Sequence, residues 1–287
     1  MFKNPFKFFR KLKDSILNLQ LKIEVLEKNQ NRLETLTSDS LDPLIRKFQQ
    51  ESLKSNLEKP ISIPPKHLQI RASGAYYPDF FNLGKIILSE INELLISTHT
   101  SIEKCNKILD FGCGCGRMLF PLSKLVDPAK IFGTDIDNEA IKWLSQKANI
   151  FGGLNTNTHN PPFNYKEATF DLIYSVSVFT HLPENMQFEW LKELSRITVS
   201  GGYVILSIHG NSHAKKLPKE IQSILKEKGF YYPNSNIGTT KGLPSFYQTS
   251  YHTKEYVINK WSKYFDVISY QEDGIGKSHD VVLLKKK

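Results

Sequence analysis

Apolar residues near the start of the chain recur at alternating steps of three and four. The seam consists of Phe9, Leu12, Ile16, Leu19, Ile23, Leu26, Gln30 and Leu33. A seam sustained over more than three heptads, with Lys and Glu around it, predicts a coiled coil, and a polar residue at a core position can fix its register. We therefore expect a homo-oligomer that assembles through this helix. The alternative is a single long helix packed against the rest of the same chain.

The pattern changes between Thr35 and Pro65. Asp42-Pro43 and Ile63-Pro64-Pro65 interrupt this stretch, which predicts a linker containing one short helix over residues 44–57. We expect residues 1–60 to form the N-terminal coiled-coil helix and linker, and residues 61–287 to form the second domain.

Beyond the linker, short apolar runs alternate with segments of helical periodicity. Helices are predicted at 83–98, 117–125, 138–149, 184–198, 219–228 and 253–264, and strands at 107–111, 131–134, 171–175, 202–208, 265–270 and 280–284. A further short strand should end near Asn157. This alternation predicts an α/β fold with a doubly wound, mostly parallel, seven-stranded sheet. The last two strands read as a hairpin, so the last strand should be antiparallel.

Composition places the chain among globular proteins. It has 287 residues, 40% of them hydrophobic, and no apolar run approaches the roughly 20 residues that cross a bilayer. Three cysteines, two of them within a Gly-rich turn, match neither a disulfide framework nor the spacing of a structural zinc site, so we expect no metal. No signal-peptide cleavage site follows the basic N-terminus, and we expect a cytoplasmic protein.

The formal net charge of +9 is concentrated at the two ends of the chain. Phenylalanines interleave with lysines and arginine over residues 2–13, which suits peripheral contact with the anionic inner face of a membrane, and an exposed basic helix end is the simpler alternative. No dense basic stripe interleaved with aromatic residues follows, which argues against nucleic acid as a partner.

The predicted strand 107–111 leads into a turn with three alternating glycines, Gly112-Cys113-Gly114-Cys115-Gly116, which Asp110 precedes. Glycines let the backbone turn sharply and approach a ligand closely. The Gly-x-Gly-x-Gly spacing differs from the Gly-x-Gly-x-x-Gly of dinucleotide sites. Asp135 ends the next strand, where a carboxylate can accept hydrogen bonds from both ribose hydroxyls of an adenosine cofactor.

These residues resemble the motifs of class I, Rossmann-like S-adenosylmethionine-dependent methyltransferases, over Lys107 to Leu284. Phe170–Leu182, Trp190–Leu194 and Gly201–Tyr203 resemble a bacterial branch often associated with cell-surface glycans and secondary metabolites. The resemblance implies S-adenosyl-L-methionine as cofactor and an antiparallel last strand. The expected cofactor residues are Asp110, Gly112, Gly114 and Gly116 at the methionine moiety, Asp135 at the ribose, and Cys113, Ile136, Asn157 and Ser175 nearby. Asn157 stands where many relatives carry an acid.

Asn160-Pro161-Pro162-Phe163 matches a tetrapeptide with which amino-methyltransferases grip a target nitrogen. In those enzymes it directly follows the fourth strand, whereas here it precedes that strand. We therefore interpret it as a Pro-rich connection. Residues 175–181 take its usual place, and His181 is the one group there that titrates near neutrality. His181 is the candidate general base, and a capping or packing role at the following helix is the alternative.

Polar aromatic residues after the fifth strand suit an acceptor-binding cover. They are His209, His213, Tyr247, Tyr251 and His252. The expected reaction is O-methylation of a saccharide or related small metabolite. The alternatives are methylation of nucleic acid or protein, and a non-catalytic methyltransferase-like subunit that assembles through the coiled coil. A nicotinamide oxidoreductase fits least.

Overall fold

The computed structural model describes residues 62–148, 150–233, 244 and 246–287. The predicted coiled coil and the helix over residues 44–57 lie outside these residues. One seven-stranded sheet organises the described part, in the strand order β3-β2-β1-β4-β5-β9-β8. The strands are β1 (Ile108–Phe111), β2 (Ile131–Asp135), β3 (Gly153–Thr156), β4 (Phe170–Ser175), β5 (Thr198–Ile208), β8 (Asp266–Ile275) and β9 (His279–Lys285).

Pairing within the sheet confirms the predicted α/β fold class. The neighbours from β3 to β5 pair in parallel, whereas β9 pairs antiparallel with both β5 and β8. Strand β1 is buried at all four positions, as expected for a central parallel strand that is covered on both faces. The last strand is therefore antiparallel, as its hairpin pattern predicts.

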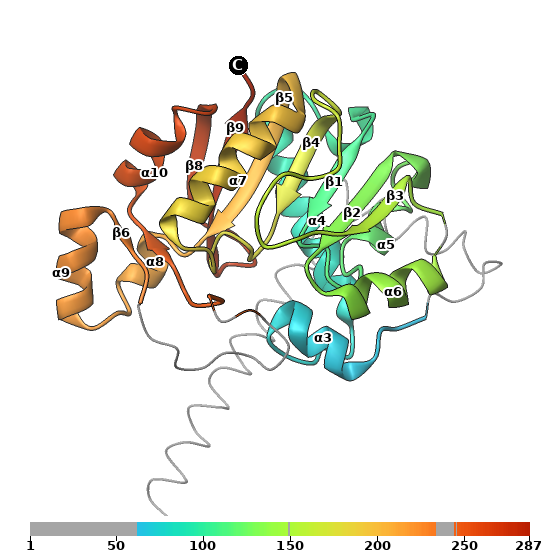
Figure 1. Cartoon of the computed structure of the whole chain (residues 1–287), viewed down its shortest axis with the longest axis horizontal. Coiled ribbons are helices and arrows are strands. Elements are labelled where there is room, and N and C mark those ends of the chain that lie inside the picture. The colour runs from blue at the N-terminus through green and yellow to red at the C-terminus, as the bar shows by residue number, and fades with distance from the viewer. Residues whose placement is uncertain (1–61, 149, 234–243, 245) are drawn as a thin grey trace, which may run out of the picture. The chain divides into compact units, whose positions relative to one another are not determined.

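Helices lie on both faces of this sheet, with α7 in front of β4 and β5 in the view of Figure 1 and α4 behind the sheet. The helices are α3 (Lys66–Ser73), α4 (Phe80–Ile96), α5 (Leu119–Leu122), α6 (Asn138–Lys147), α7 (Glu184–Ile197), α8 (Asn211–Ala214), α9 (Lys219–Lys228) and α10 (Lys254–Trp261), with 3-10 turns η1 (Ile102–Lys104) and η2 (Pro128–Lys130). A small second sheet pairs β6 (Phe230–Tyr231) with β7 (Tyr251–His252).

Several predicted boundaries need correction. Helix α5 is four residues long and not the nine predicted, since the Gly-rich turn extends into its start. Strand β5 begins at Thr198, four residues early, because Thr198 pairs with Phe170. No element is predicted over residues 66–73, where the structure has α3; Pro65 immediately precedes its first turn, where proline leaves no helical N–H unsatisfied.

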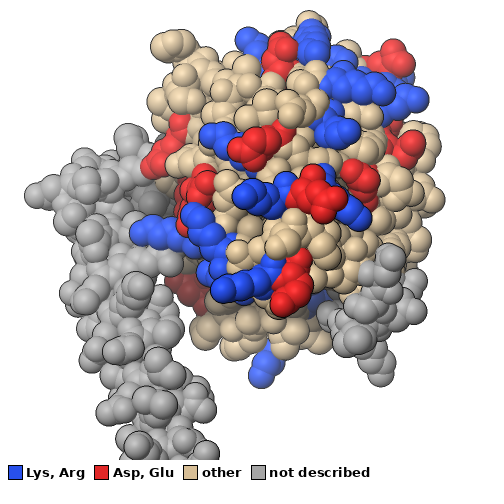
Figure 2. Space-filling model, turned by 90° about the vertical axis from the view of Figure 1, so that its left-hand side faces the viewer, with Lys and Arg blue, Asp and Glu red and all other residues tan. Residues whose placement is uncertain are grey.

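The main core is formed by side chains of β1, β4, β5 and β9 together with those of α7 and α10. Its largest fully buried side chains include Trp190, Trp261, Phe170 and Phe179. Figure 2 shows lysines and arginines interspersed with aspartates and glutamates on the face that it presents, without a continuous basic stripe. No helix of the described residues is both long and apolar enough to cross a bilayer.

Candidate active site

The turn after β1 folds back onto the end of β2. The backbone N–H groups of Gly112 and Cys113 donate to the carbonyl of Thr134, at 2.8 and 3.1 Å. Gly112 has a φ of +86°, and a Cβ at this position would lie 2.3 Å from Cγ2 of Val178. Position 112 therefore favours glycine for two reasons: its positive φ, and the close approach of Val178 in the turn after β4.

Asp135 ends β2 with its carboxylate held beside the glycines. One carboxylate oxygen accepts from the N–H of Gly114 and the other from the N–H of Asp137, both at 2.7 Å. Burial raises the pKa of Asp135, and these backbone hydrogen bonds oppose that shift. The carboxylate is thus fixed in place at the edge of the sheet where the parallel strands β1, β2 and β4 end.

An open pocket lies at this edge, with about 850 Å³ of space that includes open solvent. This position, where the chain crosses from β3 back to β4, is where open α/β sheets bind ligands. Six predicted site residues line the pocket: Gly112, Gly114, Asp135, Ile136, Asn157 and His181.

The other four predicted residues do not line the pocket. Asp110, Cys113 and Ser175 are buried, and Gly116 packs against Leu144 and Phe120. The Ser175 hydroxyl donates to the carbonyl of Phe111 at 2.8 Å. Ser175 therefore joins the ends of β4 and β1 below the pocket floor.

Asp110 lies beneath the glycine turn, and its exposed fraction is 0%. Neither carboxylate oxygen makes a hydrogen bond of acceptable geometry, although the Tyr174 hydroxyl is close enough to interact with it. Burial raises the pKa of Asp110 to about 8, and the nearby Arg117 opposes the shift. Asp110 is thus a buried acid beneath the glycine turn, and its charge partner within the chain is Arg117.

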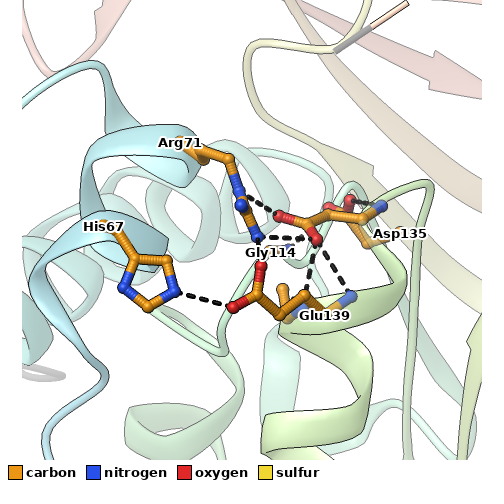
Figure 3. Close-up of polar contacts among 7 residues, drawn as sticks. His67, Arg71, Gly114, Asp135 and Glu139 are labelled. Atoms are coloured by element: carbon orange, nitrogen blue, oxygen red, sulfur yellow. Dashed lines mark hydrogen bonds and ion pairs between the residues drawn. The ribbon is translucent and has the colours of Figure 1, made fainter. Parts of the chain in front are cut away.

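The polar wall opposite Asp135 comes from α3, which the sequence did not indicate. Arg71 donates from Nε to Oδ2 of Asp137 at 2.7 Å and from Nη2 to Oδ1 at 3.0 Å. The same Nη2 reaches Glu139 at 2.7 Å, and His67 contacts the other oxygen of Glu139 at 2.8 Å (Figure 3). Both Arg71 and Ala72 line the pocket. Helix α3 is thus fastened to the start of α6 as one side of the site.

Asp137 caps the start of α6. Its carboxylate accepts from the backbone N–H groups of Glu139 and Ala140, which are the first free donors of α6. Asn157 is also engaged within the chain: it accepts from the Thr134 hydroxyl at 2.9 Å and donates to the Thr158 carbonyl at 2.9 Å.

His181 does not cap the helix that follows it, because α7 has no side-chain hydrogen bond at its N-terminus. Its Nδ1 lies 2.9 Å from the carbonyl oxygen of Gln248. Burial lowers the pKa of His181 to about 4. His181 is therefore a neutral imidazole on the pocket wall at physiological pH.

Of the five predicted cover residues, only Tyr247 lines the pocket. His209 and His213 instead pack against each other and against His279. Sequence reasoning missed several lining residues that lie far apart along the chain, and no local signal marks them: Thr158, His159, Pro244 and Phe246. Trp190, expected in the core or pocket wall, is 2% exposed and lines the pocket.

Two other interpretations can be compared with the structure. Residues 160–163 lie in the connection that precedes β4, as predicted. The three cysteines are free and buried, and within the described ranges no group of three His, Cys, Asp or Glu side chains is placed to hold a metal ion.

Residues 109–206, about a third of the chain, match the family model described as "Methyltransferase domain". Among solved structures, an S-adenosylmethionine-dependent methyltransferase from Methanosarcina mazei is 21% identical over 67% of this chain and 96% of its own, with a TM-score of 0.48. Magnesium protoporphyrin IX methyltransferase from Synechocystis PCC 6803, solved with bound SAH, is 12% identical over 88% of this chain and 100% of its own, with a TM-score of 0.49.

Proposed function

Since this chain is a class I, Rossmann-like S-adenosylmethionine-dependent methyltransferase, we propose that it methylates a hydroxyl oxygen of a neutral saccharide or related small metabolite. The observation that carries the proposal is a neutral imidazole, His181, on the wall of a pocket that Gly112, Gly114 and Asp135 also line. An acceptor hydroxyl needs such a base, because it must lose a proton as the new bond forms.

The pocket offers no unpaired cation among its described lining residues. The charged side chains of that lining are Arg71, Asp135 and Asp137, and Arg71 is already paired with Asp137. The lining also includes the neutral rings of Trp190, Phe246 and Tyr247. A phosphorylated acceptor would be held without a free cationic partner, so this lining favours an uncharged acceptor.

Within the proposed site, Asp135 would hold the ribose hydroxyls, and Gly112 and Gly114 would lie against the methionine moiety, with Asp110 buried beneath the turn. When bound, S-adenosylmethionine supplies an electrophilic methyl carbon on a sulfonium sulfur, which leaves as a neutral thioether. The chain aligns the acceptor hydroxyl with that carbon, and Nε2 of His181 takes the hydroxyl proton. Alignment alone can supply a large part of the rate in such a displacement.

The test is a methyl-transfer assay with a panel of neutral glycosides and their phosphorylated counterparts. The quantity measured is the release of S-adenosylhomocysteine. Turnover should appear with neutral members. The His181→Ala variant should lose about 100-fold in kcat, the low end of the range for a general base, while its affinity for S-adenosylmethionine stays unchanged. Wild-type turnover by the variant would remove the base assignment, and turnover confined to phosphorylated members would contradict the neutral acceptor.

The pH profile supplies an independent check. Because the pKa of His181 is lowered to about 4, its ring stays unprotonated from pH 8 down to pH 5. Protonation of His181 should therefore lower kcat only as the pH approaches 4, and not near its usual value of about 6.5.

A further inference from the structure

The segment 246–250 folds over the turn that carries His181. Backbone and side chain of Ser250 both reach this turn: its N–H donates to the Thr180 carbonyl at 2.8 Å, and its hydroxyl donates to the Phe179 carbonyl at 2.8 Å. We propose that this segment is the positioning element of His181, with the Gln248 carbonyl setting its tautomer and Tyr247 setting its ring plane. The catalytic purpose of this arrangement rests on the function proposed above.

The tautomer follows from the nature of the Gln248 group. A carbonyl oxygen only accepts, so the contact of 2.9 Å requires a hydrogen on Nδ1 of His181. In a neutral imidazole the other nitrogen, Nε2, then carries a lone pair. No hydrogen bond of Nε2 is found in the described part of the chain, so this lone pair is available to a bound hydroxyl.

Tyr247 fixes the ring plane. Its ring and that of His181 stack with centroids 3.9 Å apart and an angle of 17° between the planes. Burial raises the pKa of Tyr247 to about 12, so both stacked rings are neutral. This stacking contact opposes rotation of the imidazole away from the Gln248 carbonyl.

A buried hydrogen-bond chain holds the segment in place. The Gln187 amide donates to the carbonyls of Phe179 and Leu182, at 3.1 and 3.0 Å. Its oxygen therefore faces the other way and accepts from Nε2 of His252 at 2.9 Å. Ser250 and His252 are both fully buried. The His181 turn, the start of α7 and strand β7 are thus joined by bonds with defined donors and acceptors.

The experiment measures the tautomer directly, by long-range ¹H–¹⁵N correlation spectra of the full chain labelled at its histidines, with the His181 signals assigned by His181→Ala. The wild type should show hydrogen on Nδ1 and none on Nε2 of His181 at pH 7. A His181 ring protonated on Nε2, or averaging between the two neutral tautomers, would overturn the proposal.

Matched variants at position 247 test the role of the stack. Tyr247→Phe keeps the ring and should preserve the Nδ1–H tautomer. Tyr247→Ala removes it and should give averaged tautomer signals, with kcat lowered on the order of tenfold or more and the affinity for S-adenosylmethionine unchanged. Unaltered tautomer signals in Tyr247→Ala would contradict the role of Tyr247.

The spectra require no acceptor, so they separate the two proposals. The Nδ1–H tautomer in the wild type together with full turnover by His181→Ala would leave the positioning element intact and reject the base. If Tyr247→Ala does not fold, Tyr247→Leu supplies an apolar side chain without a ring, and the wild-type spectrum still decides the tautomer.

Discussion

Gly114, in the glycine turn after β1, contacts two neighbouring elements. Its N–H donates to Asp135, its φ is +52°, and an added Cβ would lie 2.7 Å from Cβ of Ala72 in α3. Two Cβ atoms cannot approach this closely, so any side chain at position 114 must displace α3 or the glycine turn. The spacing of the glycines predicts the turn, but the contact with Ala72 depends on tertiary structure.

Gly114→Ala should raise the Kd for S-adenosylmethionine at least tenfold and lower Tm. The matched control is Gly276→Ala, because Gly276 also has a positive φ, of +60°, but nothing lies within 4 Å of its added Cβ. Both variants incur about 1–2 kcal/mol of backbone strain, and only Gly114→Ala adds the clash. Calorimetric titration and thermal melts check this, and an equal effect of both variants on the Kd would contradict it.

At the scale of elements, α3 is the part of the site that the sequence leaves unmarked. Its eight residues bury only Leu68 and Gln69, so apolar periodicity is too weak to identify a helix. Its position depends on the bidentate pair of Arg71 with Asp137, whose partners lie 66 residues apart. A contact of this kind has no local sequence signature.

Arg71→Ala should loosen α3 and weaken cofactor binding about tenfold. The pair is partly buried, with exposed side-chain fractions of 20% and 15%, so its charged hydrogen bonds are worth roughly 1.5–3 kcal/mol. Amide hydrogen exchange should rise over residues 66–73 and stay unchanged in α7. His67→Ala is the control, because that exposed pair with Glu139 should contribute little. Unchanged exchange in Arg71→Ala would show that packing alone holds α3.

At the scale of the whole molecule, much of the fold could be predicted from hydrophobic patterning. The predicted strands at 107–111, 131–134 and 171–175 lie within a residue or so of β1, β2 and β4. Their apolar runs are buried on both faces, which makes the signal strong. Strand order and the residues that enclose the pocket depend on contacts between distant segments, such as Tyr247 on His181, and these have no signal in local periodicity.

The same reasoning explains the partial success at the site. Gly112, Gly114 and Asp135 could be predicted because a tight turn and a strand end constrain residue type locally. In the structure these three residues line one pocket. Their roles toward a cofactor follow from chemistry and remain predictions that a binding measurement can decide.

That measurement is titration calorimetry of the full chain with S-adenosylmethionine, with NAD as the control ligand. The wild type should bind S-adenosylmethionine with a Kd on the order of micromolar, about −8 kcal/mol, and should not bind NAD. Asp135→Ala should lose at least tenfold in affinity, while Asp266→Ala, which removes the same charge at an exposed position, should bind as the wild type does. Binding of NAD, or full affinity in Asp135→Ala, would contradict the assignment of this pocket to S-adenosylmethionine.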